Sequence, residues 1–287
     1  MSRQALGDIL SFKYAKDDHE FVRYFNCFGT LVDVYCDARK AGDFSLSRDA
    51  LLILQNLFLD GGEGHENIAY FIRSGGLTQL AVAIMEDYRV HRTKTENAHL
   101  ILPLTVIGIC LEDVLGKFAS NLKLNVVKDQ LFNELEALGV DDFCVTVLKQ
   151  SVHEAGTEVA YSALCILKLF ASVYVKRKSE HRITHVQKLT GAPFAFCQST
   201  FTKEYLTNNC KLGSARICVV FCAFRLLNIL ARCHIGCFQG LFHDTPKNVD
   251  KESLLQINRT ELLHMFSIFF PTWKKIWKSW KLFPRWN

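Results

Sequence analysis

The stretch SRDALLILQNLFLDGGEGHENIAYFIRSGGLTQLAVAI, residues 47–84, decides the fold. In its first part, apolar side chains recur at the i, i+3, i+4, i+7 spacing of one helix face: Ala50, Leu51, Leu54, Leu57 and Phe58. Ser47 and Asp49 are candidates for the N-cap of this helix. A glycine-rich turn follows, then a short helix from about Asn67, a break at Gly75 and Gly76, and another helix. The stretch therefore predicts three successive helices separated by turns.

The glycine pair explains how the second helix turns into the third. Glycine has no Cβ, so Gly75 and Gly76 let the chain change direction sharply where a side chain would clash. Similar junctions recur before other apolar segments: Gly29 with Thr30, Gly139, and Gly191 with Ala192. Successive junctions are about 46, 63 and 53 residues apart. The sequence thus indicates a three-helix unit that recurs at uneven intervals.

Residues 47–84 resemble an armadillo repeat. The matching positions are Ala50, Leu54, Asn56, Leu57, Asn67, Ile68, Ile72, Gly75, Gly76, Leu77 and Leu80. The resemblance implies an all-α, armadillo-like α-solenoid of about four to five irregular three-helix repeats over residues 1–270. Regular arrays repeat every 40–47 residues or so, so we expect insertions or longer helices, including apolar helices over about residues 96–118, 157–176 and 214–233. Another α-solenoid or an irregular helical bundle is the alternative.

The resemblance also implies a groove lined by the third helix of each repeat. These helices are expected over about residues 31–40, 77–88, 141–151 and 193–205. The residues expected to contact a partner protein are Gln79, Asp87, Lys149 and Gln198. Armadillo proteins that bind basic nuclear-import signals use tryptophan on these helices, and none occurs there in this chain. The class of partner therefore stays open at this point.

Composition and charge narrow the class of protein. Of 287 residues, 49% are hydrophobic and 22% charged, as in ordinary soluble globular proteins. The net charge of +5 comes entirely from residues 271–287, so no nucleic-acid partner is expected for the rest of the chain. The N-terminus lacks a signal-peptide pattern, and the apolar runs at residues 100–111 and 217–231 are too short or too interrupted to span a bilayer. We expect an intracellular protein, cytoplasmic rather than nuclear, although residues 175–182, VKRKSEHR, leave a nuclear signal open.

No pattern in the sequence points to catalysis. It contains no Gly-x-Ser-x-Gly elbow, no phosphate-binding Gly-x-x-x-x-Gly-Lys-Ser/Thr loop and no His-Glu-x-x-His pair. We therefore expect neither enzymatic activity nor a cofactor. Cys218, Cys222, Cys233 and Cys237 could in principle bind zinc, but the first two lie in an apolar helix pattern. Packing in the core is the preferred interpretation, so no metal site is predicted.

Residues 271–287 form a tail of different composition, which holds all four tryptophans of the chain. On a helix, Trp273, Trp277 and Trp280 share one face. Lysines occupy much of the remaining surface: Lys274, Lys275, Lys278 and Lys281. This pattern is typical of an amphipathic helix that binds an anionic membrane surface or a partner. The alternative interpretations are a cap on the last repeat and a read-through segment without a role. The main prediction is a non-enzymatic scaffold, and the alternative is a peripheral membrane protein anchored by this tail.

Overall fold

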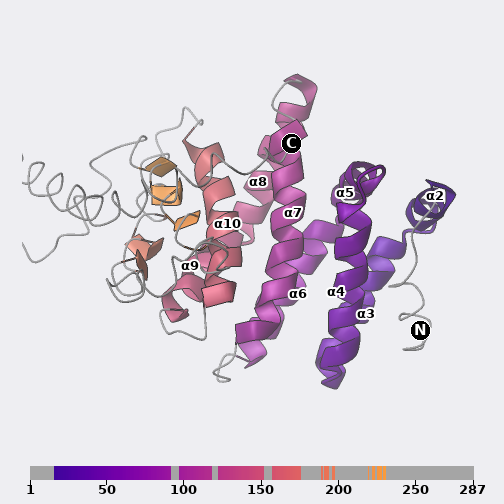
Figure 1. Ribbon diagram of the computed structural model, residues 1–287, viewed down its shortest axis with the longest axis horizontal. Coiled ribbons are helices and arrows are strands. Elements are labelled where there is room, and N and C mark those ends of the chain that lie inside the picture. Colours follow the sequence, from indigo (N-terminus) through magenta and orange to yellow (C-terminus); the bar gives the residue numbers. More distant parts are fainter. Residues whose placement is uncertain are drawn as a thin grey trace, which may run out of the picture. The chain divides into compact units, whose positions relative to one another are not determined.

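The described part of the chain folds into α-helices (Figure 1). The computed structural model describes residues 16–91, 97–117, 122–151 and 157–175, together with single residues and short runs between 189 and 230. No strand occurs among these residues, which confirms the all-α prediction. Contacts between residues divide the chain into two units, Met1–Val173 and Tyr174–Asn287.

Short turns join most of the helices that begin in the first unit. In chain order they are α2 (Lys16–Tyr24), α3 (Cys27–Ala41), α4 (Phe44–Leu59), α5 (Gly64–Arg73), α6 (Gly76–His91), the 3-10 helix η1 (Asn97–Leu100), α7 (Ile101–Lys117), α8 (Leu122–Ala137), α9 (Val140–Gln150) and α10 (Thr157–Tyr174). The helices expected over residues 96–118 and 157–176 correspond to η1 with α7 and to α10. Helix α8 has no counterpart in the sequence prediction.

The second unit is described at few positions. The described positions between 189 and 230 are helical, and most are buried, including Leu189, Phe196, Val219, Leu226 and Leu230. The described part of the helix expected over residues 214–233 is therefore helical. Residues 271–287 lie outside the described residues. The proposed division into a repeat domain over residues 1–270 and a tail over residues 271–287 stays a prediction.

Helix α4 begins earlier than the sequence indicated. Its N-cap is Asp43, whose Oδ1 accepts a hydrogen bond from the backbone N–H of Leu46 at 3.1 Å. The prediction of Ser47 or Asp49 as the cap was wrong, because both lie inside the helix. The apolar pattern starts late since the first turn of α4 is largely exposed, with Phe44 51% accessible. A helix terminus outside the core carries no periodic signal.

Left-handed residues mark four of the described helix junctions, one of which is Gly42 (φ 75°) between α3 and α4. Gly75 (φ 80°) precedes α6 and Gly139 (φ 79°) precedes α9, at the junctions expected from the sequence. Before α3 the left-handed residue is Asn26 (φ 48°), whereas the predicted junction residues Gly29 and Thr30 lie inside α3. Asparagine is among the few residues besides glycine that adopt this conformation readily.

The junction between α5 and α6 also requires a close approach. A Cβ on Gly76 would lie 2.3 Å from the ring of Phe71, so no side chain fits there without moving the ring. Helix α5 and residues Gly76–Val90 meet at an angle of 73°. The two glycines thus have separate roles, because Gly75 supplies the backbone conformation and Gly76 the space.

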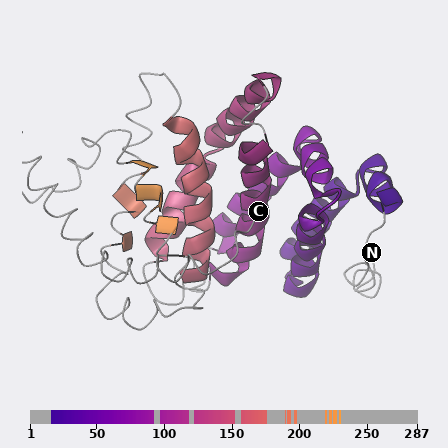
Figure 2. The same ribbon diagram turned by 45° about the horizontal axis from the view of Figure 1, so that its top comes forward.

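The core of the first unit forms where successive helices pack together. Helix α3 contacts α4 and α6, α4 contacts α7, and α6 contacts α9; α4 and α7 lie side by side in both Figure 1 and Figure 2. Aromatic rings fill the space between α3, α4 and α5, where the Phe58 ring centroid lies 5.7 Å from Phe28 and 5.1 Å from Phe71. All three rings are buried, so this cluster fixes how the helices meet.

Among the described helices, none is long and apolar enough on its own to cross a membrane. Helix α5 and residues Gly76–Val90 meet that requirement of length and composition only when taken together as a bent pair.

Replacing Gly75 by alanine tests the junction. A Cβ there meets no atom within 4 Å, so the cost comes from the left-handed backbone alone and should be about 1–2 kcal/mol of unfolding free energy. Gly108 in α7 is the matched control, because its Cβ also meets nothing but its φ is not positive. Gly108→Ala should stabilise by about 0.5–1 kcal/mol. Urea unfolding followed by circular dichroism measures both variants, and equal effects would contradict the junction's role.

Candidate binding surface on α3, α6 and α9

Helices α3, α6 and α9 carry accessible residues with the same spacing. At i, i+4 and i+7 these are Asp33, Asp37 and Lys40 on α3; Gln79, Ala83 and Glu86 on α6; and Asp142, Thr146 and Lys149 on α9. All are exposed except Ala83 and Thr146, which are half-buried. Residues at this spacing share one helix face. Because α6 contacts both α3 and α9, we call these residues together the α3–α6–α9 surface.

An exposed hydrogen bond joins two positions of this surface. The side-chain amide of Gln79 on α6 donates to Oδ1 of Asp33 on α3 at 2.7 Å. The first positions of the two accessible faces therefore point toward the same side of the helix pair. The bond is exposed and contributes little to stability by itself.

A buried ion pair holds the same two helices together beneath the surface. Arg39 of α3 donates from Nε and from one terminal nitrogen to the two carboxylate oxygens of Asp87 on α6, at 3.0 and 2.6 Å. Both residues are buried, at 8% and 9% exposure. The guanidinium also lies 4.7 Å from the ring centroid of Phe44, and Nε2 of His99 is 3.6 Å from Asp87 Oδ2. A bidentate pair in this setting fixes the relative position of the helices.

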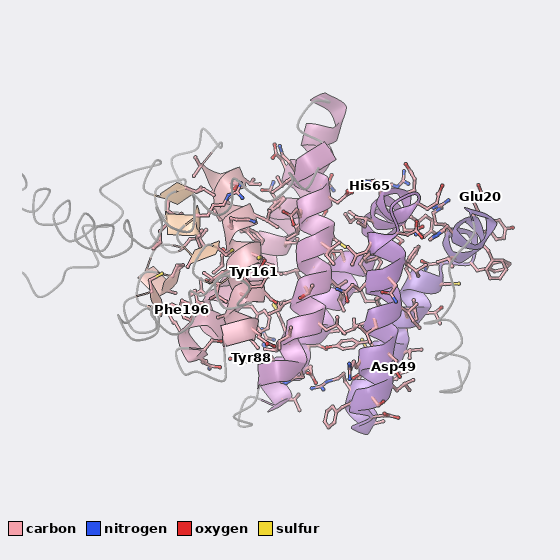
Figure 3. The ribbon with its side chains drawn as sticks, in the orientation of Figure 1. Glu20, Asp49, His65, Tyr88, Tyr161 and Phe196 are labelled. Atoms are coloured by element: carbon pink, nitrogen blue, oxygen red, sulfur yellow. The ribbon has the colours of Figure 1, made fainter. Side chains whose placement is uncertain are left out.

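Helices α6 and α9 meet through Tyr88 (Figure 3). Its hydroxyl donates a hydrogen bond to Oε1 of Gln150 at the end of α9. Its ring packs edge-on against Phe143, with centroids 5.2 Å apart. Tyr88 and Phe143 are buried whereas Gln150 is exposed, so this contact ties the core to the edge of the α3–α6–α9 surface.

Carboxylates gather around Cys36 of α3. Burial raises the pKa of this thiol, and Lys40 opposes that shift. The nearby carboxylates of Asp33, Asp37 and Glu86 raise the pKa further. At the i and i+4 positions of the three helices, the charged side chains of the surface are all acidic. Both basic residues of the surface stand at i+7 positions, where the residues are Lys40, Glu86 and Lys149. The surface thus offers both charge signs at separate positions.

Of the four predicted partner-binding residues, two are exposed, one is buried and one lies outside the described residues. Gln79 and Lys149 are exposed on the α3–α6–α9 surface. Asp87 is buried and uses both oxygens for Arg39, so it belongs to the packing between α3 and α6. Glu86, its neighbour in sequence, is the exposed acidic residue there. Gln198 lies outside the described residues.

The tail residues and most of the cysteines considered for zinc cannot be placed. Trp273, Lys274, Lys275, Trp277, Lys278, Trp280 and Lys281 lie outside the described residues, as do Cys218, Cys233 and Cys237. Cys222 is described and buried. Within the described part of the chain, no group of His, Cys, Asp or Glu side chains is arranged to hold a metal ion. Burial strongly raises the pKa of the Cys110 and Cys144 thiols, which keeps them neutral in the core.

No protein-family model matches the chain, and neither does any curated protein or solved structure. The resemblance to armadillo repeats therefore remains a prediction based on residues 47–84.

Breaking the buried pair should cost far more than breaking the exposed bond above it. Asp87→Asn leaves the Arg39 charge buried without a counter-ion, and the expected loss is about 3–5 kcal/mol of unfolding free energy. Gln79→Ala removes the exposed bond and should cost less than about 1 kcal/mol. Urea unfolding of the two variants and of wild type measures the difference. Similar losses for the two would show that the buried pair does not hold α3 against α6.

Proposed function

We propose that the chain is an armadillo-like repeat protein that acts as a non-enzymatic scaffold or adaptor. In this proposal a segment of a partner protein lies on the α3–α6–α9 surface, which corresponds to a groove of third helices. The first repeat contributes α2 and α3, the second α4 to α6, and the third α7 to α9. Helix α10 opens a fourth repeat.

Contacts between helices of like position support this repeat assignment. Third helices are joined by Asp33–Gln79, Arg39–Asp87 and Tyr88–Gln150, whose partners are 46, 48 and 62 residues apart. Second helices are joined by Arg23 and Asn67, which are 44 residues apart. First helices are joined by the Thr105 and Ser162 hydroxyls, 57 residues apart at 3.3 Å. Each pair links a helix to its counterpart one repeat later.

The observation that carries the binding proposal is the matched set of accessible positions on α3, α6 and α9. Polar residues at the same i, i+4, i+7 spacing on three neighbouring helices form a grid rather than a single strip. A peptide in extended or helical form can contact such a grid at several points. Amide and charged side chains, Gln79 and Lys149 among them, can pair with its backbone and side chains. Ala83, the middle position on α6, has a small side chain and is half-buried.

Charge reversal on the surface tests the proposal. Asp37→Lys combined with Glu86→Lys changes two exposed residues of α3 and α6. If a partner segment lies there, reversed charges should weaken its binding by at least about tenfold. The full chain, wild type and variant, is used to capture proteins from lysate, and quantitative mass spectrometry compares what each retains.

The control variant carries the same charge change on another helix. Asp129→Lys with Glu134→Lys alters two exposed acidic residues of α8, which contributes nothing to the surface. Proteins lost from the α3–α6 variant but kept by the α8 variant support the proposal. Proteins kept by both or lost from both contradict it, because binding would then not depend on this surface.

A second candidate function is suggested by the composition of the tail. We propose as the alternative that residues 271–287 attach the chain to an anionic membrane surface. All four tryptophans lie there, three of them at the spacing of one helix face, together with five basic residues. Indole rings favour the interface of a bilayer. Each lysine near an anionic leaflet adds about 1 kcal/mol.

Vesicle sedimentation tests this alternative. The full chain should bind vesicles that contain phosphatidylserine but not neutral ones, and raising the salt concentration should release it. Trp273→Ala combined with Trp277→Ala should abolish binding, because both rings belong to the shared face. Trp286→Ala, which lies off that face in sequence register, is the matched control and should bind nearly as wild type. Unchanged binding of the double variant would rule out the tail as an anchor.

A further inference from the structure

Helix α2 and Phe25, which follows it directly, expose three aromatic rings that pack against one another. Phe21, Tyr24 and Phe25 are 58%, 83% and 58% exposed. The Phe21 and Phe25 ring centroids are 4.4 Å apart, and those of Tyr24 and Phe25 are 5.0 Å apart. We call these residues the aromatic face of α2; Glu20, next to Phe21 in sequence, marks the helix in Figure 3. A contiguous exposed apolar patch of this kind indicates a surface that is covered by something else.

Polar contacts on the opposite side of α2 fix the orientation of this face. Arg23 donates to Glu63 at 3.1 Å from each of its terminal nitrogens, and to Asn67 at 2.9 Å. His19 is only 1% exposed, and its Nδ1 lies 2.8 Å from Nδ2 of Asn67. These contacts anchor α2 to the start of α5. The helix therefore cannot turn its rings into the core without losing a buried hydrogen-bond network.

Tyr70 of α5 corresponds in position to Phe21 of α2, and its ring is partly covered by another helix. Phe21 and Tyr70 each lie five residues before a left-handed residue, Asn26 and Gly75 respectively. Tyr70 is half-buried, with its ring centroid 5.9 Å from that of Phe28 on α3. The cover of Tyr70 thus comes from chain that precedes α4 and α5. By the same geometry, the cover of the aromatic face should come from chain that precedes α2.

Residues 1–15 meet this requirement by position and by pattern. They join α2 directly at Lys16, and Leu6, Ile9 and Leu10 follow the i, i+3, i+4 spacing of one helix face. Fifteen residues at helical rise span about 22 Å, and the distance along α2 from Lys16 to Phe25 is about 14 Å. The segment is therefore long enough to lie along the whole aromatic face. As a tethered segment it binds without the entropy loss of bringing two molecules together.

We propose that residues 1–15 dock on the aromatic face of α2, with Leu6, Ile9 and Leu10 against the rings of Phe21, Tyr24 and Phe25. The inference rests on the proposed correspondence of α2 with α5, but it does not depend on the proposed binding of a partner.

Photo-crosslinking of the full chain tests the docking. The photoreactive analogue p-benzoyl-phenylalanine replaces Phe25, and after irradiation the products are separated by mass, digested with trypsin and sequenced by mass spectrometry. The expected product has the mass of a single chain and joins the Phe25 position to the peptide of residues 4–13. The same analogue at Leu59, which is 60% exposed on α4, is the control and should not label that peptide. A crosslink between two chains, a crosslink elsewhere in the chain, or no crosslink would overturn the proposal.

Two further variants separate an apolar contact from a non-specific one. Leu6→Asp with Ile9→Asp removes two apolar side chains and should lower the ratio of docked to undocked chain by about 100-fold, so the crosslink should disappear. Ser2→Asp with Gln4→Asp introduces the same charge at polar positions and should leave the crosslink in place. Loss in both variants, or in neither, would show that the apolar residues do not make the contact. A far-ultraviolet circular dichroism spectrum like that of wild type checks that each variant remains folded.

Discussion

The ion pair between Arg39 and Asp87 is the interaction on which the arrangement of α3 and α6 depends. Removing two charges from water costs several kcal/mol for each, and only a well-aligned pair offsets that cost. Here both carboxylate oxygens are used, at 3.0 and 2.6 Å. Each partner lies one residue from an exposed one, Lys40 after Arg39 and Glu86 before Asp87. The buried pair therefore also determines where these exposed side chains stand.

Directional polar contacts of this kind define register in a way that apolar packing does not. Leucine and phenylalanine side chains tolerate small shifts between helices, whereas a hydrogen bond is lost when its partners move apart by an ångström. Asn67 illustrates the point, since it is fully buried on α5. Its Nδ2 donates to the backbone carbonyl of Leu57 in α4, and its Oδ1 accepts from Arg23 of α2. One side chain thus fixes three helices relative to one another.

Local sequence patterns predicted the elements that depend on local chemistry. The apolar spacing in residues 50–58 and the glycines at 75 and 139 predicted α4 and the starts of α6 and α9. Features that depend on distant partners were missed. Nothing near Asp87 in sequence indicates that Arg39, 48 residues earlier, will take its carboxylate. Neighbouring helix residues differ in direction by about 100°, so the exposed residue beside the predicted Asp87 is Glu86.

The residues that start α3 and α4 were also not predicted from the sequence. Asn26 was overlooked because a left-handed residue is usually a glycine. The sequence therefore predicted the junction at Gly29, which lies inside α3. Asp43 was overlooked because the first turn of α4 is too exposed to show an apolar period. Both residues act through their backbone or through a single capping bond. A pattern of buried side chains cannot reveal either role.

The uneven spacing of the junctions has a physical explanation in the helices that lie between them. Asn26 and Gly75 are 49 residues apart, and Gly75 and Gly139 are 64 apart. Part of the difference lies in α8, which has 16 residues where α5 has 10. Even so, Tyr88 of α6 and Gln150 of α9 form a hydrogen bond across 62 residues. Added length in the connecting helices therefore leaves the contact between α6 and α9 intact, and the α3–α6–α9 surface continues although the segments between its helices differ in length.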